Sequence, residues 1–177
     1  MHRRIAPLLA AVLGAGLLTA GAPAAPAERA AAPKTVVGVA AGDRRFTTLV
    51  ALVKQAGLAK TLSGKGPFTV FAPTNAAFAE LKASAPATYQ AVSTNPALLR
   101  KVLTYHVLAK RVPSSTAIAA AKKRASVKTV QGEQIALSIK AGKLVLNGSS
   151  RVIVADVKAS NGVIHAVDAV LVPPSAT

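Results

Sequence analysis

Three polar residues near the end of the chain have the types that a hydrolytic triad needs. Ser160, His165 and Asp168 would supply a nucleophile, a general base and a carboxylate that orients the base. Their spacing argues against this chemistry, because the segment is typical of a β-strand and side chains three residues apart on a strand point to opposite faces. We therefore expect His165 to be a half-buried histidine, hydrogen-bonded by neighbouring polar groups, and we expect the chain not to be an enzyme.

Tyr105 and His106 form a second candidate site. The pair ends a segment that Asn95 and Pro96 predict to be a helix, and aliphatic residues lie on both sides of it. A phenol and an imidazole at this position can contact a binding partner, or they can pack the junction between the helix and the next strand. The sequence leaves both interpretations open.

No group of residues predicts a metal or a cofactor. The chain has no cysteine and three histidines, and its carboxylates are scattered singly. A zinc site needs several ligands at a recognisable spacing, and the sequence contains no such pair. The glycines on either side of Lys65 match no phosphate-binding loop, so they indicate turns.

Positive charge dominates the polar residues. The full chain has 22 Lys and Arg against six Asp and Glu, a formal net charge of +16, and no carboxylate occurs between Leu81 and Gly132. Such a surface attracts an anionic polysaccharide, wall polymer or lipid headgroup layer. The contacts that we expect from this part of the chain are Lys110, Arg111, Lys122, Lys123, Arg124 and Lys128. Alternatively, these charges only keep the protein soluble.

A specific nucleic acid is not an expected partner. Single-stranded nucleic acids are normally bound by stacking aromatic side chains, and duplexes by a helix that enters a groove. The chain has only four Phe and two Tyr, and most of them occupy apolar positions of predicted elements. These rings are therefore expected in the core.

The first part of the chain has the layout of a secretory signal peptide, which we predict over residues 1–27. Arg3 and Arg4 precede an apolar stretch that is too short to span a membrane, and small residues follow it. Removing the two arginines leaves 20 basic residues against six acidic ones, a net charge of +14. We expect an exported protein, extracellular, at the cell surface or in the periplasm, with no membrane span and with residues 28–34 as a linker.

The rest of the chain predicts helices first and strands later. Apolar residues at helical spacing follow Asp43, and Pro86 and Pro96 each stand where a helix begins. Ser114 and its two hydroxyl neighbours are expected to cap another short helix. After it, apolar and polar residues alternate between turn dipeptides such as Asn147-Gly148, which is typical of antiparallel hairpins. This order predicts an α+β domain.

Three segments together resemble a fasciclin-type domain. Residues 66–78 read GPFTVFAPTNAAF, residues 95–108 contain the Tyr-His pair at 105–106, and residues 161–173 read NGVIHAVDAVLVP. The order and separation of these segments resemble the first box, the Tyr-His motif and the second box of that family, over residues 35–173. Residues 174–177 would then be a tail. The resemblance implies an antiparallel β-sandwich or wedge core with several helices packed on one side.

The resemblance also implies roles for single residues. In the family, Thr74, Asn75 and His165 would form a buried polar network, and we place Asp168 with them as a structural residue. Tyr105 and His106 would belong to an adhesion or ligand-binding segment. The chain has no Arg-Gly-Asp sequence and the Tyr-His pair has basic neighbours, so an integrin is not the expected partner.

These observations predict a secreted, monomeric, non-enzymatic adhesion or binding module. It would act at the cell surface or in the extracellular matrix, on a surface or matrix protein or on an anionic polysaccharide or wall polymer. Because some fasciclin-type proteins resemble pigment binders, the alternative is a carrier of a hydrophobic small molecule, either a pigment or a lipid.

Overall fold

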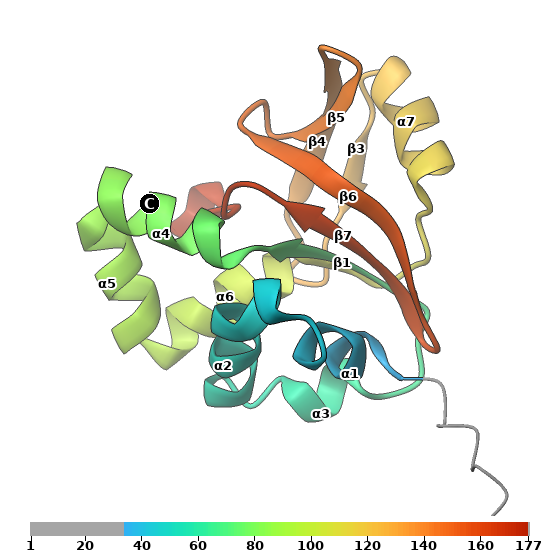
Figure 1. The fold of residues 1–177 in the computed structure, drawn as a ribbon. Coiled ribbons are helices and arrows are strands. Elements are labelled where there is room, and N and C mark those ends of the chain that lie inside the picture. Colours follow the sequence, from blue (N-terminus) through green and yellow to red (C-terminus); the bar gives the residue numbers. More distant parts are fainter. Residues whose placement is uncertain (1–33, 177) are drawn as a thin grey trace, which may run out of the picture. The chain divides into compact units, whose positions relative to one another are not determined.

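The computed structural model describes residues 34–176 (Figure 1). The predicted signal peptide and nearly all of the predicted linker lie outside the described residues. Seven strands form one sheet in the order β2-β1-β7-β6-β5-β4-β3. The strands are β1 (Phe68–Pro73), β2 (Val107–Leu108), β3 (Ser126–Lys128), β4 (Gln134–Lys140), β5 (Lys143–Leu146), β6 (Ser150–Ala159) and β7 (Gly162–Val167).

All seven α-helices of the described residues precede β3, and β1 and β2 lie among them in the chain. The helices are α1 (Val36–Ala41), α2 (Thr47–Gln55), α3 (Ala59–Leu62), α4 (Asn75–Ser84), α5 (Pro86–Thr94), α6 (Pro96–Tyr105) and α7 (Ser114–Lys122), with short 3-10 helices η1 (Arg44–Phe46) and η2 (Pro174–Ala176). The order of helices and strands confirms the α+β class. Helices α1 and α3 are too short to show a periodic pattern and were not predicted.

The helix starts predicted at Pro86 and Pro96 are confirmed, and a third helix begins at a hydroxyl cap. Thr74 has an extended backbone and its hydroxyl accepts a hydrogen bond from the N–H of Ala77, so it caps α4. Pro86 begins α5, and α6 begins at Pro96 directly after Asn95, whose side-chain oxygen caps the first turn. These local signals place the Tyr-His pair at the carboxyl end of α6.

Strands β1 and β7 lie side by side and run parallel, whereas the other neighbouring strands are antiparallel. We expected an antiparallel core. The parallel pairing of β1 with β7 is where the structure differs from that expectation. Phe71 and His165 are direct partners in this pairing. The backbones approach closely at Gly162, where an added Cβ would lie 2.2 Å from the carbonyl oxygen of Phe68. Glycine is required there because the space for any side chain is occupied by backbone.

The sheet separates two apolar clusters, which explains why every residue of β7 is buried. One cluster joins Ile164 and Ala166 to α1, α2 and α6, and the other contains Phe71, Val167 and the inner residues of β4 and β5. Helices α1 to α6 gather beside the β1 and β7 end of the sheet (Figure 1). Helix α7 instead contributes Ala117 and Ala121 to the second cluster, so the helices are not all on one side.

Several boundaries differ from the sequence prediction. The last strand ends at Val167, so it covers only the first half of the 161–173 segment. Ser114 is the first residue of α7 and does not cap it: the carboxylate of Asp156, in β6, accepts hydrogen bonds from the backbone N–H and the hydroxyl of Ser114. The predicted tail contains η2, and the carbonyl of Ser175 accepts a hydrogen bond from the ammonium of Lys101.

Candidate functional site

The Tyr-His pair lies in the interior. Tyr105 is 0% exposed, and its hydroxyl donates to the carbonyl of Gln134 at 3.0 Å and accepts from the side-chain amide of Asn147 at 2.8 Å. The phenol therefore ties the end of α6 to the strands of the second cluster. Every hydrogen-bonding site that a buried hydroxyl normally uses is occupied within the protein.

His106 is 2% exposed and both of its ring nitrogens are engaged. Nδ1 donates to the carbonyl of Val102 at 2.8 Å, and Nε2 accepts from the backbone N–H of Leu171 at 2.9 Å. These partners require the neutral ring with its proton on Nδ1. Burial lowers the pKa of His106 from 6.5 to about 4, which keeps the ring neutral near pH 7.

The burial of Tyr105 and His106 decides between the two interpretations of the pair. Neither side chain is available to a partner, so the prediction that they contact a ligand directly is wrong for this structure. Their role is to pack and hydrogen-bond the junction between α6 and β2. The signal that could have shown this is the run of aliphatic residues on both sides, which is typical of a buried segment.

His165 is fully buried and does not form a triad. Its Nε2 donates to the carbonyl of Val112 at 2.9 Å, its Nδ1 accepts from the backbone N–H of Asp156 at 3.3 Å, and its ring stacks on Phe71 with centroids 5.7 Å apart. The carboxylate of Asp168 instead accepts a hydrogen bond from the backbone N–H of Arg151. The expectation that His165 and Asp168 do not pair is confirmed, and the histidine is more deeply buried than the half-buried state we expected.

The other predicted members of the polar network have separate partners. Thr74 caps α4, and Asn75 binds the carbonyl of Arg44 and the N–H of Thr48, so it fixes η1 and the start of α2. Asp168 is partly exposed and accepts a 2.7 Å hydrogen bond from the backbone N–H of Arg151. All are structural residues, but the prediction that they form one buried network with His165 is wrong.

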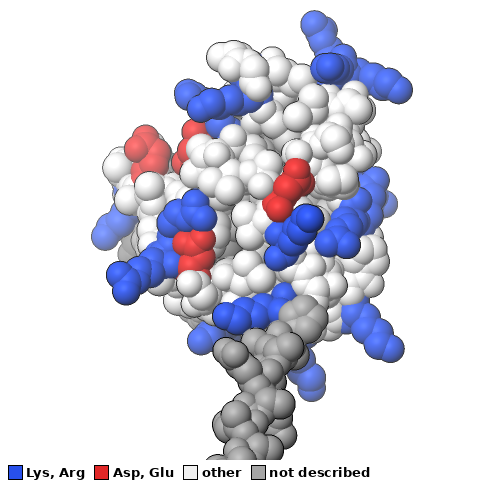
Figure 2. Space-filling model, turned by 45° about the vertical axis from the view of Figure 1, so that its right-hand side comes forward, with Lys and Arg blue, Asp and Glu red and all other residues white. Residues whose placement is uncertain are grey.

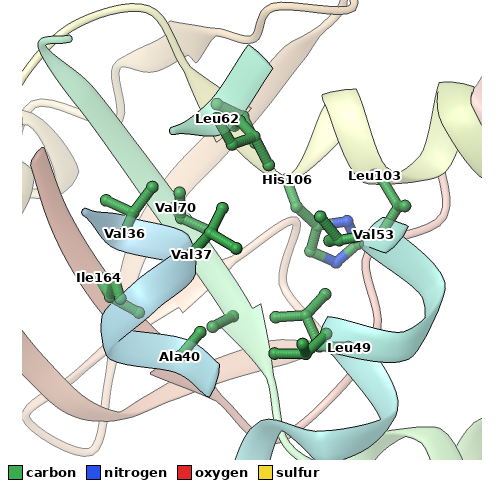
Figure 3. Close-up of a pocket in the computed structure, with 13 residues that line it drawn as sticks. Val36, Val37, Ala40, Leu49, Val53, Leu62, Val70, Leu103, His106 and Ile164 are labelled. Atoms are coloured by element: carbon green, nitrogen blue, oxygen red, sulfur yellow. The ribbon is translucent and has the colours of Figure 1, made fainter. Parts of the chain in front are cut away.

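A small apolar cavity lies between α1, α2 and β1, next to the imidazole of His106 (Figure 3). Valine, leucine, isoleucine and alanine side chains make up the rest of its wall, including Val36, Ala40, Leu49 and Val53. Its volume is about 30 Å³, against roughly 300–1,000 Å³ for pockets that hold drug-sized ligands. A small molecule therefore enters only if α1 or α2 moves.

The six predicted basic contacts are all exposed. Lys110 and Arg111 follow β2, three residues surround the end of α7, and Lys128 lies in β3. The described residues contain two ion pairs, Asp43 with Arg45 and Asp168 with Arg151, and neither involves one of the six. Figure 2 shows the Lys and Arg side chains of one face as separate groups with few acidic side chains between them.

Residues 34–176 contain neither a group of metal ligands nor a membrane-spanning helix. No three His, Asp or Glu side chains of this region come together as metal ligands. Within the same region, no helix has the length and apolar character needed to cross a bilayer.

Comparison with known sequences identifies the family. The sequence model of the Fasciclin domain matches residues 44–173. The chain is 46% identical to protein sll1483 of Synechocystis over 79% of this chain and 74% of that protein. It is 33% identical to immunogenic protein MPB70 of Mycobacterium bovis, over 92% of this chain and 81% of that protein.

Larger animal proteins contain similar segments. The pig transforming growth factor-beta-induced protein ig-h3 is 38% identical over 80% of this chain, which corresponds to 20% of the pig protein. The solved structure of a FAS1 domain pair from the insect cell adhesion molecule Fasciclin I matches 81% of this chain and 52% of its own, with a TM-score of 0.71 and 18% identity. That likeness shows the same fold.

The family consists of non-enzymatic adhesion proteins. The sequence model of the Fasciclin domain covers most of the chain, and the bacterial relatives align over most of their length. The fold matches that of the solved FAS1 domain pair. The chain therefore belongs to the fasciclin domain family.

Proposed function

We propose that this fasciclin domain is a secreted binding module that attaches to anionic polymers at the cell surface or in the extracellular matrix. The observation that carries the proposal is the set of six exposed basic residues without ion pairs among the described residues. Charges that no carboxylate neutralises remain available to a polyanion. A predicted signal peptide over residues 1–27 would deliver the protein to that location.

The basic residues around α7 and β3 are the ones to test. We define the α7–β3 group as Lys122, Lys123, Arg124 and Lys128, which are close in sequence and exposed. Changing all four to Gln should weaken binding to immobilised polygalacturonate, measured by surface plasmon resonance at low salt. The matched control changes four other exposed lysines, Lys54, Lys60, Lys82 and Lys143, and so removes the same charge.

The expected result is a larger loss in the first variant than in the control, and no binding of either to neutral dextran. Binding of the unmodified protein should also disappear at 0.5 M salt, because the screening length then falls to about 4 Å. Equal losses in the two variants would show that net charge alone attracts the polymer. Retention on polygalacturonate at 0.5 M salt would contradict the electrostatic proposal.

A second candidate, a carrier of a hydrophobic small molecule, rests on the apolar wall of the small cavity and requires α1 or α2 to move. That wall is almost wholly apolar, and the side chains of α1 and α2 cover it (Figure 3). Protein purified from its native host should then contain a visible pigment or an extractable lipid. Ala40→Leu, which fills the cavity, should reduce that content, whereas a colourless and lipid-free preparation would exclude the carrier.

A further inference from the structure

We propose that a surface cleft around Arg111 is a specific binding site for a sugar unit that carries a carboxylate or phosphate group. The cleft is separate from the Tyr-His region and from the α7–β3 group. The inference rests on the proposed function, because it names the site where an anionic polymer would be held. Its volume of about 610 Å³ lies within the range of ligand pockets.

Four segments that are distant in sequence form the wall of this cleft. They are the start of α1 at Thr35, the loop of residues 63–67 before β1, Arg111 after β2, and the turn of residues 160–162 between β6 and β7. No acidic side chain lines it, so the charges of Lys65 and Arg111 are not neutralised locally. An oxyanion is the ligand that such a site attracts.

Asn161 makes the base of the cleft rigid. Its side-chain oxygen accepts from the N–H of Val36 at 2.8 Å, and its side-chain nitrogen donates to the carbonyls of Leu62 and Gly64, each at 2.8 Å. One amide thus joins α1, the loop before β1 and the β6–β7 turn. A site that is already ordered loses less conformational entropy when a ligand binds.

Arg111 is held in place while most of its hydrogen-bonding capacity remains free. Its Nη2 donates to the carbonyl of Gly162 at 3.3 Å, and the described residues provide no other partner for the guanidinium. The planar group has five N–H donors, and its remaining ones suit the two oxygens of a carboxylate or phosphate. The ammonium of Lys65 supplies a second positive charge on the same wall.

Hydroxyl groups indicate that the ligand is a sugar and not a bare ion. Ser63 and Ser160 both line the cleft, and among the described residues neither side-chain hydroxyl has a hydrogen-bond partner. Each can donate to and accept from a sugar hydroxyl. No aromatic ring lines the cleft, so it offers no stacking surface for an uncharged sugar, and the charged group must supply much of the affinity.

Another open concavity of the described residues lacks these properties. It has a volume of about 420 Å³ and is lined by Arg44, Arg45, Asn75 and Ile153, among others. Arg45 is paired with Asp43 at 2.7 Å, and Asn75 is engaged by η1 and α2. One of its two cations and its amide are already used within the protein, so we assign the anionic sugar to the cleft at Arg111.

Isothermal titration calorimetry with trigalacturonate tests the assignment. Lys65→Gln with Arg111→Gln should weaken binding about tenfold or more, because two charge-assisted contacts are lost. The control, Lys82→Gln with Lys143→Gln, removes the same charge elsewhere and should change affinity less than about twofold. Maltotriose, which is neutral, should not bind. Melting temperatures verify that all variants fold, and Lys65→Gln alone, which removes no hydrogen bond of the described structure, serves as a second variant.

A second pair of substitutions distinguishes a site for a sugar from a site for a simple ion. Ser63→Ala with Ser160→Ala should weaken trigalacturonate binding and leave the affinity for inorganic phosphate unchanged. The assignment would be overturned if Lys65→Gln with Arg111→Gln left trigalacturonate binding unchanged, or weakened it only as much as the control does. This holds even if the polymer still binds. Failure of the whole protein to bind polygalacturonate would instead overturn the proposed function.

Discussion

His106 shows how a residue with catalytic potential can be committed to structure. An imidazole near its ordinary pKa exchanges a proton readily at neutral pH, but this one is buried and uses both nitrogens for backbone groups. Protonation would place a hydrogen on Nε2, where the N–H of Leu171 already donates. The ring is therefore a fixed link between α6 and the segment after β7.

Acid should weaken the fold through this residue. The folded pKa of about 4 lies below the unfolded value near 6.5, so the stabilisation is fully present above pH 6.5 and is lost as pH falls towards 4. The free energy of unfolding should decrease by about 3 kcal/mol over that range because of His106. Urea unfolding at several pH values between 4 and 7 measures it.

His106→Gln provides the comparison, because an amide can donate and accept but does not titrate in this range. The variant should be less stable at pH 7 and should show a flatter pH profile between 4 and 6.5. Parallel profiles for the two proteins would mean that His106 does not titrate as its environment requires.

The roles of single residues were only partly predictable. The cap at Thr74 follows from a hydroxyl at a strand-to-helix boundary, which is a local signal. The burial of Tyr105 depends on Gln134 and Asn147, which are about 30 and 40 residues away, and no local pattern contains that information. For the same reason the sequence did not reveal that Asp156 binds the first turn of α7.

At the level of elements, the parallel pair of β1 and β7 is the centre of the architecture. The two family boxes are these two strands and their flanking turns, and Gly66 and Gly162 let their backbones meet. The sequence predicted both strands and their turns. It did not predict their direction relative to each other, because strand pairing across almost a hundred residues is set by tertiary packing.

Gly162→Ala should destabilise the protein by about 3 kcal/mol or more, because the new methyl group would overlap backbone that cannot move aside. Thermal or urea unfolding measures the loss. Gly42→Ala is the matched control: Gly42 has φ −82° and the nearest atom to an added Cβ is 3.5 Å away, so its effect should stay within about 1 kcal/mol. Similar stability of the two variants would show that the strands can separate locally.

For the molecule as a whole, charge and surface composition predict a monomer. The net charge is +16, and the large hydrophobic side chains that are exposed in the described region, Ile118, Val130, Ile139 and Ile153, come from four different elements or loops. Like charges repel, and single exposed residues give no interface. Analytical ultracentrifugation should give the mass of one chain at 50 mM and at 500 mM salt. A dimer at low salt would contradict this prediction.

The position of β7 has a consequence for how the protein is made. This strand lies between β1 and β6 in the sheet and contributes to both apolar clusters, yet it is the last of the seven strands to leave the ribosome. Until it emerges, β1 has no partner on that side and neither cluster can close. We therefore expect the nascent polypeptide to remain incompletely folded almost to the end of synthesis.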